Sequence, residues 1–262
     1  MYVGFVLKLV LPGLCVCIFN TRMFEPRFYR QWGKRNDLIS CHITVKQTDL
    51  YIQARSDVRG KAMRATLKYR MSIEEYIQKH PLFVTTLKPY PVEDNAPVIV
   101  KEMNKASTLV NVGPMAAIAG AIAEAVGKEL LSFSPDIIVE NGGDIFLKTT
   151  KKRIIGIYAG ESPLTGKIAL EIKPQETPVG ICTSSATVGH SLSLGNADAV
   201  VVLSHSTPFA DAAATAIGNL VHDSNDIPKA IEKAKAMKSL YGVVIIKGEK
   251  IGLWGKIKIH NS

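Results

Sequence analysis

Apolar and polar side chains alternate along two neighbouring stretches early in the chain, Leu38–Val45 and Asp49–Ala54, which predicts a β-hairpin. Helical spacing follows over Val58–Tyr69. Ser72 stands before two glutamates, an arrangement typical of a helix N-cap, so we expect a second helix to begin there. The most apolar helical pattern covers Met115–Leu131, and its many alanines and glycines indicate that another element packs close to its backbone.

The second half of the chain carries short apolar runs bounded by glycine, proline and polar residues, the pattern of β-strands. We expect strands at 136–139, 145–147, 154–159, 168–173, 180–184 and 199–203, helices at 209–221 and 228–240, and a closing hairpin of 242–246 with 250–259. Strands and helices come in blocks and do not alternate strictly. This order predicts an α+β fold: a largely antiparallel sheet with helices packed on one face, in a single compact domain.

The first 22 residues differ in character from the rest. Tyr2–Phe19 is apolar, but it is interrupted by Lys8 and Pro12, and no small-residue cleavage site follows it. Three interpretations stay open: an extension that is not native, with the natural start at Met23; a signal or anchor; or a structural helix. We expect residues 1–22 to be an apolar extension and residues 23–262 to form the domain.

Composition limits the classes of function. The 262-residue chain is 47% hydrophobic and contains four cysteines, which are not paired as CxxC. It has no uninterrupted apolar run of about 18 residues, which argues against a polytopic membrane protein. The cysteines are too few for a disulfide scaffold and lack the spacing of a structural zinc site. We expect a cytoplasmic protein, with membrane association left open by the N-terminal segment.

The net charge of +9 raises the question of nucleic-acid binding. The excess of lysine and arginine lies between Arg27 and Lys105, interleaved with acids and apolar residues, so nucleic acid is not expected as a ligand. The one continuous basic run, Lys151-Lys152-Arg153, is predicted to form a solvated hairpin turn. A small anionic ligand such as a nucleotide cofactor fits this charge better.

Two short segments could carry chemistry on turns and helices. Glu140-Asn141-Gly142-Gly143-Asp144 is typical of a tight turn, and bare glycine backbone also lets a ligand approach closely. Both interpretations can hold together. Asp211 and Thr215 are four residues apart, so on a helix they share one face, where a carboxylate and a hydroxyl could bind Mg²⁺. Asp211 could also simply stabilise the start of a helix.

A third segment, Cys182–Ser193, is a strand followed by a loop of serine, threonine and glycine that contains His190. It could be a surface turn rich in hydroxyls, or it could bring hydroxyl and imidazole donors to a phosphate or a flavin. A serine hydrolase is disfavoured because no Gly-x-Ser-x-Gly segment is present. Cys182 itself could be a reactive thiol or an ordinary buried cysteine.

Four segments follow one another along the chain: Gly113–Gly120, Glu140–Asp144, Thr183-Ser184-Ser185 and Ala210–Thr215. Together they resemble the ApbE superfamily, the Mg²⁺-dependent FAD:protein FMN transferases, whose fold is related to the T-fold. Two further segments, Phe24–Arg30 and Gly189–Gly195, are similar to one poorly characterised branch, uncharacterised protein family 0280. The resemblance covers about Met23 to Ile259.

The resemblance implies a role for each matching residue. It places a metal on Asp211 and Thr215. It makes the loop before Gly120, with Gly113 and Ala117, the one that lines the flavin pyrophosphate and lends a backbone carbonyl to the metal. The turn and the hydroxyl loop would also contact the flavin, through Asn141, Gly142, Gly143, Thr183, Ser184 and Ser185. His190 would orient phosphate and is the candidate catalytic residue.

The sequence departs from the transferases in several places. Ala119 stands where they usually have a lysine, and Ser185 replaces the glycine of their Thr-Ser-Gly. Their acidic residue a few positions after the glycine would be Glu124. A long insert with a histidine and an Asp-Pro-x-x-Gly segment, which helps to hold FAD, is absent. The metal pair is retained, but much of the FAD clamp is not.

Two functions are therefore expected as alternatives. One is an enzyme that binds FAD with Mg²⁺ and cleaves or transfers it, giving FMN and AMP, with an acceptor protein as partner. The other is an accessory protein of the same fold in sulfur assimilation to homocysteine, in which Cys182 or Cys41 carries sulfur to or from a sulfur-pathway protein. A homodimer is expected from the resemblance to the ApbE superfamily.

Overall fold

The alternating residues early in the chain form the hairpin that their pattern predicts. In the computed structural model, which describes residues 27, 30, 37–188 and 193–261, β1 (Ile39–Val45) pairs antiparallel with β2 (Thr48–Ala54). Ile43 and Ile52 of this hairpin are fully buried and belong to the core that lies under the helices. The apolar extension expected at residues 1–22 lies outside the described residues.

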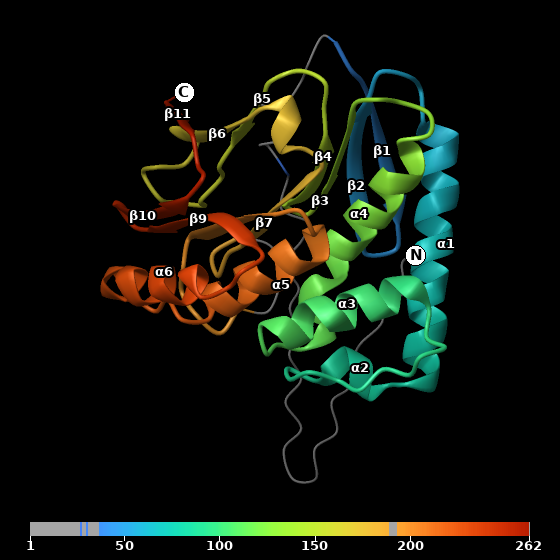
Figure 1. The fold of residues 1–262 in the computed structure, drawn as a ribbon, viewed down its shortest axis with the longest axis horizontal. Helices are drawn as coiled ribbons and strands as arrows, with labels where there is room; N and C mark the ends of the chain where they lie inside the picture. The colour runs from blue at the N-terminus through green and yellow to red at the C-terminus, as the bar shows by residue number, and fades with distance from the viewer. Residues whose placement is uncertain (1–26, 28–29, 31–36, 189–192, 262) are drawn as a thin grey trace, which may run out of the picture.

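Eight strands form one sheet in the order β1-β2-β3-β4-β7-β8-β9-β10 (Figure 1). The six that follow the first hairpin are β3 (Ile137–Asn141), β4 (Asp144–Lys148), β7 (Val179–Ser184), β8 (Ala199–Ser204), β9 (Leu240–Lys247) and β10 (Lys250–Gly255). Each strand is antiparallel to its neighbours. The predicted α+β class with a largely antiparallel sheet is confirmed.

Helices cover one face of this sheet (Figure 1). Those that pack on it are α1 (Arg59–Lys79), α4 (Ile118–Leu130), α5 (Thr207–Gly218) and α6 (Ile227–Lys235), while α2 (Leu82–Thr85) and α3 (Val98–Leu109) contact other helices. Short 3-10 turns occur at Pro114–Ala117, Pro174–Glu176 and Ser224–Asp226. Among the described helices, none alone is long and apolar enough to span a membrane; α3 and residues 114–130 meet that criterion only together, across a bend of 106°.

The small residues of α4 allow the close packing that their pattern predicts. A Cβ atom added to Gly127 would lie 2.1 Å from the ring of Phe146 in β4, so only glycine leaves room for that ring. Phe146 is almost fully buried as a result, and α4 lies directly against the centre of the sheet.

A second, three-stranded sheet covers the other face, and the sequence did not predict this layer. Its order is β11-β6-β5, built from β11 (Ile259–Asn261), β6 (Ile168–Ile172) and β5 (Arg153–Gly156) (Figure 1). Leu147, Leu170 and Val244 lie in the apolar core between the two sheets. Residues 250–259 are therefore not one strand, because β10 ends at Gly255 and Ile259 pairs with β6.

Two predicted helix boundaries are wrong. No helix begins at Ser72, because α1 runs without a break for 21 residues and the Ser72 hydroxyl donates to the carbonyl oxygen of Lys68 at 3.1 Å inside it. The helix expected at 228–240 ends at Lys235, and Leu240 is already the first residue of β9. In both cases contacts with distant parts of the chain decide the outcome against the local pattern.

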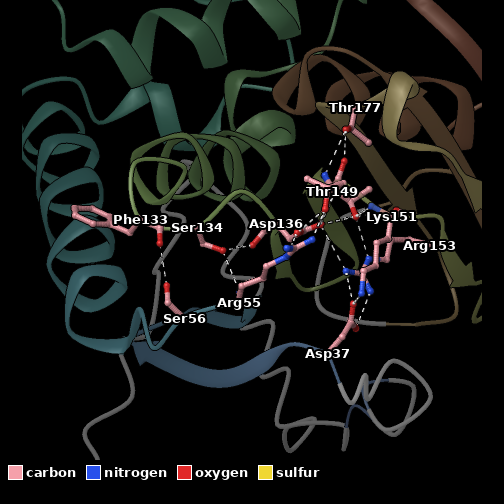
Figure 2. A network of polar contacts seen from close by, with 11 residues as sticks. Asp37, Arg55, Ser56, Phe133, Ser134, Asp136, Thr149, Lys151, Arg153 and Thr177 are labelled. Atoms are coloured by element: carbon pink, nitrogen blue, oxygen red, sulfur yellow. Dashed lines mark hydrogen bonds and ion pairs between the residues drawn. The ribbon is translucent and has the colours of Figure 1, made fainter.

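The basic run at 151–153 is not a uniformly solvated turn. Arg153 is buried, and its guanidinium makes two hydrogen bonds to the carboxylate of Asp37, at 3.0 and 3.1 Å (Figure 2). Asp136, with no exposed surface, accepts hydrogen bonds from the hydroxyl of Thr149 at 2.8 Å and pairs with Arg55. These five residues, Asp37, Arg55, Asp136, Thr149 and Arg153, form what we call the Asp136 network.

Candidate functional site

The Glu140–Asp144 segment is both a tight turn and part of a larger site. Asn141 and Asp144 pair as the last residues of β3 and the first of β4, and the two glycines between them have φ values of +68° and +106°. Residues other than glycine rarely adopt these φ values. The Gly143 N–H donates to the Glu140 carboxylate at 2.9 Å, and this hydrogen bond restrains the turn.

The turn contacts the beginning of α4, and α4 in turn contacts α5. The Asn141 side-chain amide donates to the carbonyl oxygen of Ala119 at 3.1 Å, and the Gly120 N–H donates to the Asp211 carboxylate at 2.8 Å. A Cβ at Gly120 would stand 2.6 Å from the carbonyl oxygen of Thr207, so glycine is required where the two helices meet. Segments about 90 residues apart are thereby joined by direct hydrogen bonds.

The end of β7 completes the same region. The Thr183 N–H donates to Asp144 at 3.2 Å, and Ser184 lies against Gly218 of α5. The Ser185 hydroxyl accepts hydrogen bonds from the N–H groups of Thr187 and Val188 in its own loop, and its contact with the flavin stays a prediction. Thr183 and Ser184 are thus brought to the site, whereas Ser185 shapes the loop that follows.

Two carboxylates make this region electrostatically unusual. Burial raises the pKa of Asp144 well above its ordinary value, and the nearby carboxylates of Asp211 and Glu140 add to the rise. Burial also raises the pKa of Asp211, to about 7, although the backbone amides of Gly120 and Ala119 act in the opposite direction. Such carboxylates are stabilised in their charged form when a cation lies beside them.

The donor set near Asp211 fits a hard divalent cation. Asp211 and Thr215 lie one turn apart on α5, both partly exposed, and offer carboxylate and hydroxyl oxygens from one helix face. Within the part of the chain that the structure describes, no group of three or more His, Cys, Asp or Glu side chains is arranged to hold a metal. Mg²⁺ is compatible with this, since it often takes one or two carboxylates and completes its shell with water and phosphate oxygens.

The roles predicted for three further site residues stay predictions. Gly113 lies where a Cβ would come within 1.9 Å of the carbonyl oxygen of Thr86, so it serves the packing of the chain before α4. Ala117 is fully buried and directly precedes the first residue of α4. His190 lies outside the described residues, and its role in orienting phosphate stays a prediction.

Glu124 has a structural role in this fold. One of its carboxylate oxygens accepts the N–H of Thr207, the first residue of α5, at 2.6 Å, and the other pairs with Lys128 at 2.5 Å. A carboxylate at this position satisfies a free N–H at the start of the helix and interacts favourably with its dipole. Glu124 therefore orients α5, on which Asp211 and Thr215 lie.

The described cysteines do not have the surroundings of reactive thiols. Cys182 is fully buried, its thiol donates to the carbonyl oxygen of Thr207, and burial together with Asp144 and Asp211 raises its pKa well above the ordinary value. Burial also raises the pKa of Cys41. Both thiols stay protonated at neutral pH, which makes them poor nucleophiles.

Sequence reasoning missed two arginines beside the turn. Arg27 forms an ion pair with Asp49 at 2.9 Å, and Arg30 pairs with Asp49 at 3.1 Å and with Glu140 at 2.6 Å. Both belong to the segment Phe24–Arg30 that had been noted only as a family signature. Nothing in its local pattern shows that its partners are a β2 residue and a β3 residue far along the chain.

The fold is that of the ApbE flavin transferases. The structure matches the apo form of the flavinyl transferase ApbE from Pseudomonas stutzeri with a TM-score of 0.52 and 12% identity, over 84% of this chain and 95% of that one. It matches the ApbE protein from Thermotoga maritima with a TM-score of 0.50 and 14% identity, over 86% and 97%. At these identities the likeness concerns the fold.

Sequence comparison defines the family more narrowly. A family model described as AbpE bacteria matches residues 30–242. A UPF0280 protein of Methanocaldococcus jannaschii is 45% identical over 223 residues, which is 82% of this chain and 90% of the relative. A UPF0280 protein of Methanosarcina acetivorans is 38% identical over 219 residues, 82% and 86% of the two chains. The chain belongs to this family, and within the ApbE-like superfamily it is a member of the UPF0280 branch.

Proposed function

We propose that this protein binds FAD together with Mg²⁺ and transfers the FMN portion to a hydroxyl group of an acceptor protein. In that reaction the acceptor oxygen bonds to the FMN phosphorus, the pyrophosphate bond breaks, AMP leaves, and the hydroxyl proton is released. The fold of a flavinyl transferase supports the class of reaction. Fold alone does not determine chemistry, so the proposal depends on the site.

The observation that carries the proposal is the meeting of four separated segments at one place. The start of α4 contacts Asp211 through Gly120 and contacts the β3–β4 turn through Ala119, and Asp144 at the end of that turn contacts β7 at Thr183. One region is therefore bordered by a glycine turn, by a strand end that carries hydroxyl groups, and by two carboxylates. Such a combination suits a ligand with phosphates and a bound cation.

Each residue of the proposed site would have its own role. Asp211 and Thr215 would hold the cation, with Asp211 oriented by the Gly120 N–H. Gly142 and Gly143 would let the ligand approach the backbone, and the hydroxyls of Thr183 and Ser184 would donate to its phosphates. When bound, Mg²⁺ supplies charge neutralisation and polarisation at the pyrophosphate.

No observation favours the alternative role in sulfur assimilation. That role needs a thiolate that can accept sulfur, and burial raises the pKa of both described thiols, Cys41 and Cys182. The flavin proposal, by contrast, uses side chains that are grouped in the structure and that carry oxygen donors.

The test is FAD binding by the full chain, measured by isothermal titration with and without Mg²⁺, followed by chromatography for released AMP. We expect binding that EDTA abolishes and that Asp211→Asn weakens about 100-fold or more. Glu232→Gln, an exposed carboxylate on α6, is the matched control and should leave affinity unchanged. FAD binding that needs no Mg²⁺ and is unaffected by Asp211→Asn would contradict the proposal, as would a complete lack of binding.

A further inference from the structure

Arg30 forms a fork between two acids on neighbouring strands. Its Nε lies 2.6 Å from one oxygen of Glu140, its Nη1 lies 3.1 Å from the Asp49 carboxylate, and its Nη2 donates to the Asp49 carbonyl oxygen at 3.0 Å. Glu140 and Asp49 are buried, at 6% and 3% exposure. A planar guanidinium can satisfy several acceptors at fixed angles, which an ammonium group cannot do.

The second oxygen of Glu140 contacts the glycine turn. It accepts the N–H of Gly143 at 2.9 Å, while the first oxygen is held by Arg30. A direct chain of contacts therefore runs from Arg30 through Glu140 to the backbone of the glycine turn. Two successive glycines have many backbone conformations open to them, so a restraint in addition to the pairing of Asn141 with Asp144 narrows the conformations of this turn.

Arg27 also contacts this turn. Its Nη1 contacts the Asp49 carboxylate at 2.9 Å and the Asp49 carbonyl oxygen at 3.0 Å. Its Nη2 would stand 3.5 Å from a Cβ atom at Gly142, which places the guanidinium against the glycine backbone. We call Arg27, Arg30, Asp49, Glu140 and Gly143 the Glu140 cluster.

We propose that Glu140, held by Arg30, is a positioning residue that keeps the Gly142–Gly143 turn in the conformation that receives the flavin nucleotide. This inference rests on the proposed function, because it names what holds the ligand-binding turn of the same site. Glu140 acts through the Gly143 amide and needs no contact with the ligand. Its negative charge pairs with Arg30 and also contributes to the raised pKa of Asp144, so Arg30→Lys, which keeps both charges, tests the geometry alone.

The structure offers a matched pair of variants. Arg30→Lys keeps a positive charge but removes the fork, and Arg55→Lys makes the same change at the other end of β3, where Arg55 pairs with Asp136. Glu140→Gln is a second variant of the restraint: it keeps an oxygen for the Gly143 N–H and weakens the link to Arg30.

Three measurements on the full chain test the proposal: FAD affinity with Mg²⁺, the melting temperature, and hydrogen exchange at the Gly143 amide. We expect Arg30→Lys to speed Gly143 exchange and weaken FAD binding, each by about tenfold, with a smaller effect for Glu140→Gln. Arg55→Lys disturbs the pair with Asp136 and should lower the melting temperature, yet leave both other readouts unchanged. A purely structural role for Arg30 would give no such separation.

The outcomes separate this inference from the proposed function. If the wild-type protein binds FAD and Arg30→Lys changes neither Gly143 exchange nor affinity, the positioning role is wrong and the flavin proposal stands. Equal losses of affinity in Arg30→Lys and Arg55→Lys would also overturn it. If the wild-type protein binds no FAD, the proposed function fails, and the flavin role of Glu140 fails with it.

Discussion

The two ends of β3 carry ion pairs of the same chemical kind, and they differ in what those pairs restrain. At the beginning of the strand, Asp136 is surrounded by Arg55, Arg153 and the hydroxyl of Thr149 (Figure 2). At its end, Glu140 is held by Arg30 and accepts a backbone N–H from Gly143. Each end therefore has a buried acid that a guanidinium neutralises.

The partners of the two acids explain the difference. The Asp136 network connects Asp37 before β1 with the residues that follow β2, precede β3 and follow β4, and with the first residue of β5. The Glu140 cluster connects to a turn of two glycines beside Asp144 and the start of α4. We therefore expect the same pairing chemistry to serve stability where it joins strand ends, and site geometry where it contacts a turn of two glycines.

The largest effect on stability is expected at the Asp136 end. Asp136→Asn would remove the buried anion that pairs with Arg55 and accepts hydrogen bonds from Thr149 and Thr150, and the free energy of unfolding should fall by about 2–4 kcal/mol. Urea unfolding followed by circular dichroism measures this, with Glu232→Gln as an exposed control that changes it by less than about 0.5 kcal/mol. A loss below about 1 kcal/mol for Asp136→Asn would show that the hydroxyls alone hold these strands.

A smaller effect on stability, but a specific one on binding, is expected at the turn. Gly143 has a φ of +106° and no atom closer than 3.9 Å to an added Cβ, so Gly143→Ala should cost about 1–2 kcal/mol through backbone strain alone. FAD affinity should fall about tenfold with it. Gly248→Ala is the control, because Gly248 also has a positive φ, +61°, with open space around it in the β9–β10 turn. Equal FAD affinity in the two variants would remove the turn from the site.

The smallest effect is a pH dependence confined to the Asp136 network. Hydrogen bonds from Arg153 lower the pKa of Asp37 from 3.8 to about 2. A lowered pKa stabilises the folded state above the unfolded value, and this stabilisation disappears as the pH falls from about 4 to about 2. Urea unfolding of the wild type and Asp37→Asn should therefore differ at pH 5 and converge near pH 2. Parallel curves across that range would mean that the Asp37–Arg153 pair adds nothing.

Local patterns in the sequence predict much of this fold and the outline of the site. The first hairpin, α4 and the strands at 180–184 and 199–203 follow from periodicity, because each is long enough or regular enough to show it. The meeting of Gly120, Asn141, Thr183 and Asp211 is what the resemblance to the ApbE superfamily implies. Direct contacts among their segments confirm that these segments are neighbours.

The rest depends on contacts that no local pattern contains. The second sheet is made of strands of three to five residues, and a short apolar run does not show which of two layers it joins. Arg153 looked like a surface residue because Asp37, its partner, is 116 positions away. Arg30 lies 110 positions from Glu140, and its role appears only once β2 and β3 are neighbours.

The pairing of β11 with β6 has a consequence for folding during synthesis. Ile259 lies opposite Leu170, so β6 has β5 on one side but lacks its second neighbour until the residues of β11 have left the ribosome. Until then an unpaired strand edge borders an apolar layer, a state that favours association with other chains. Slower translation of the residues after β10 should therefore lengthen the time for which this edge is exposed, and chaperone binding to it should raise the yield of folded protein.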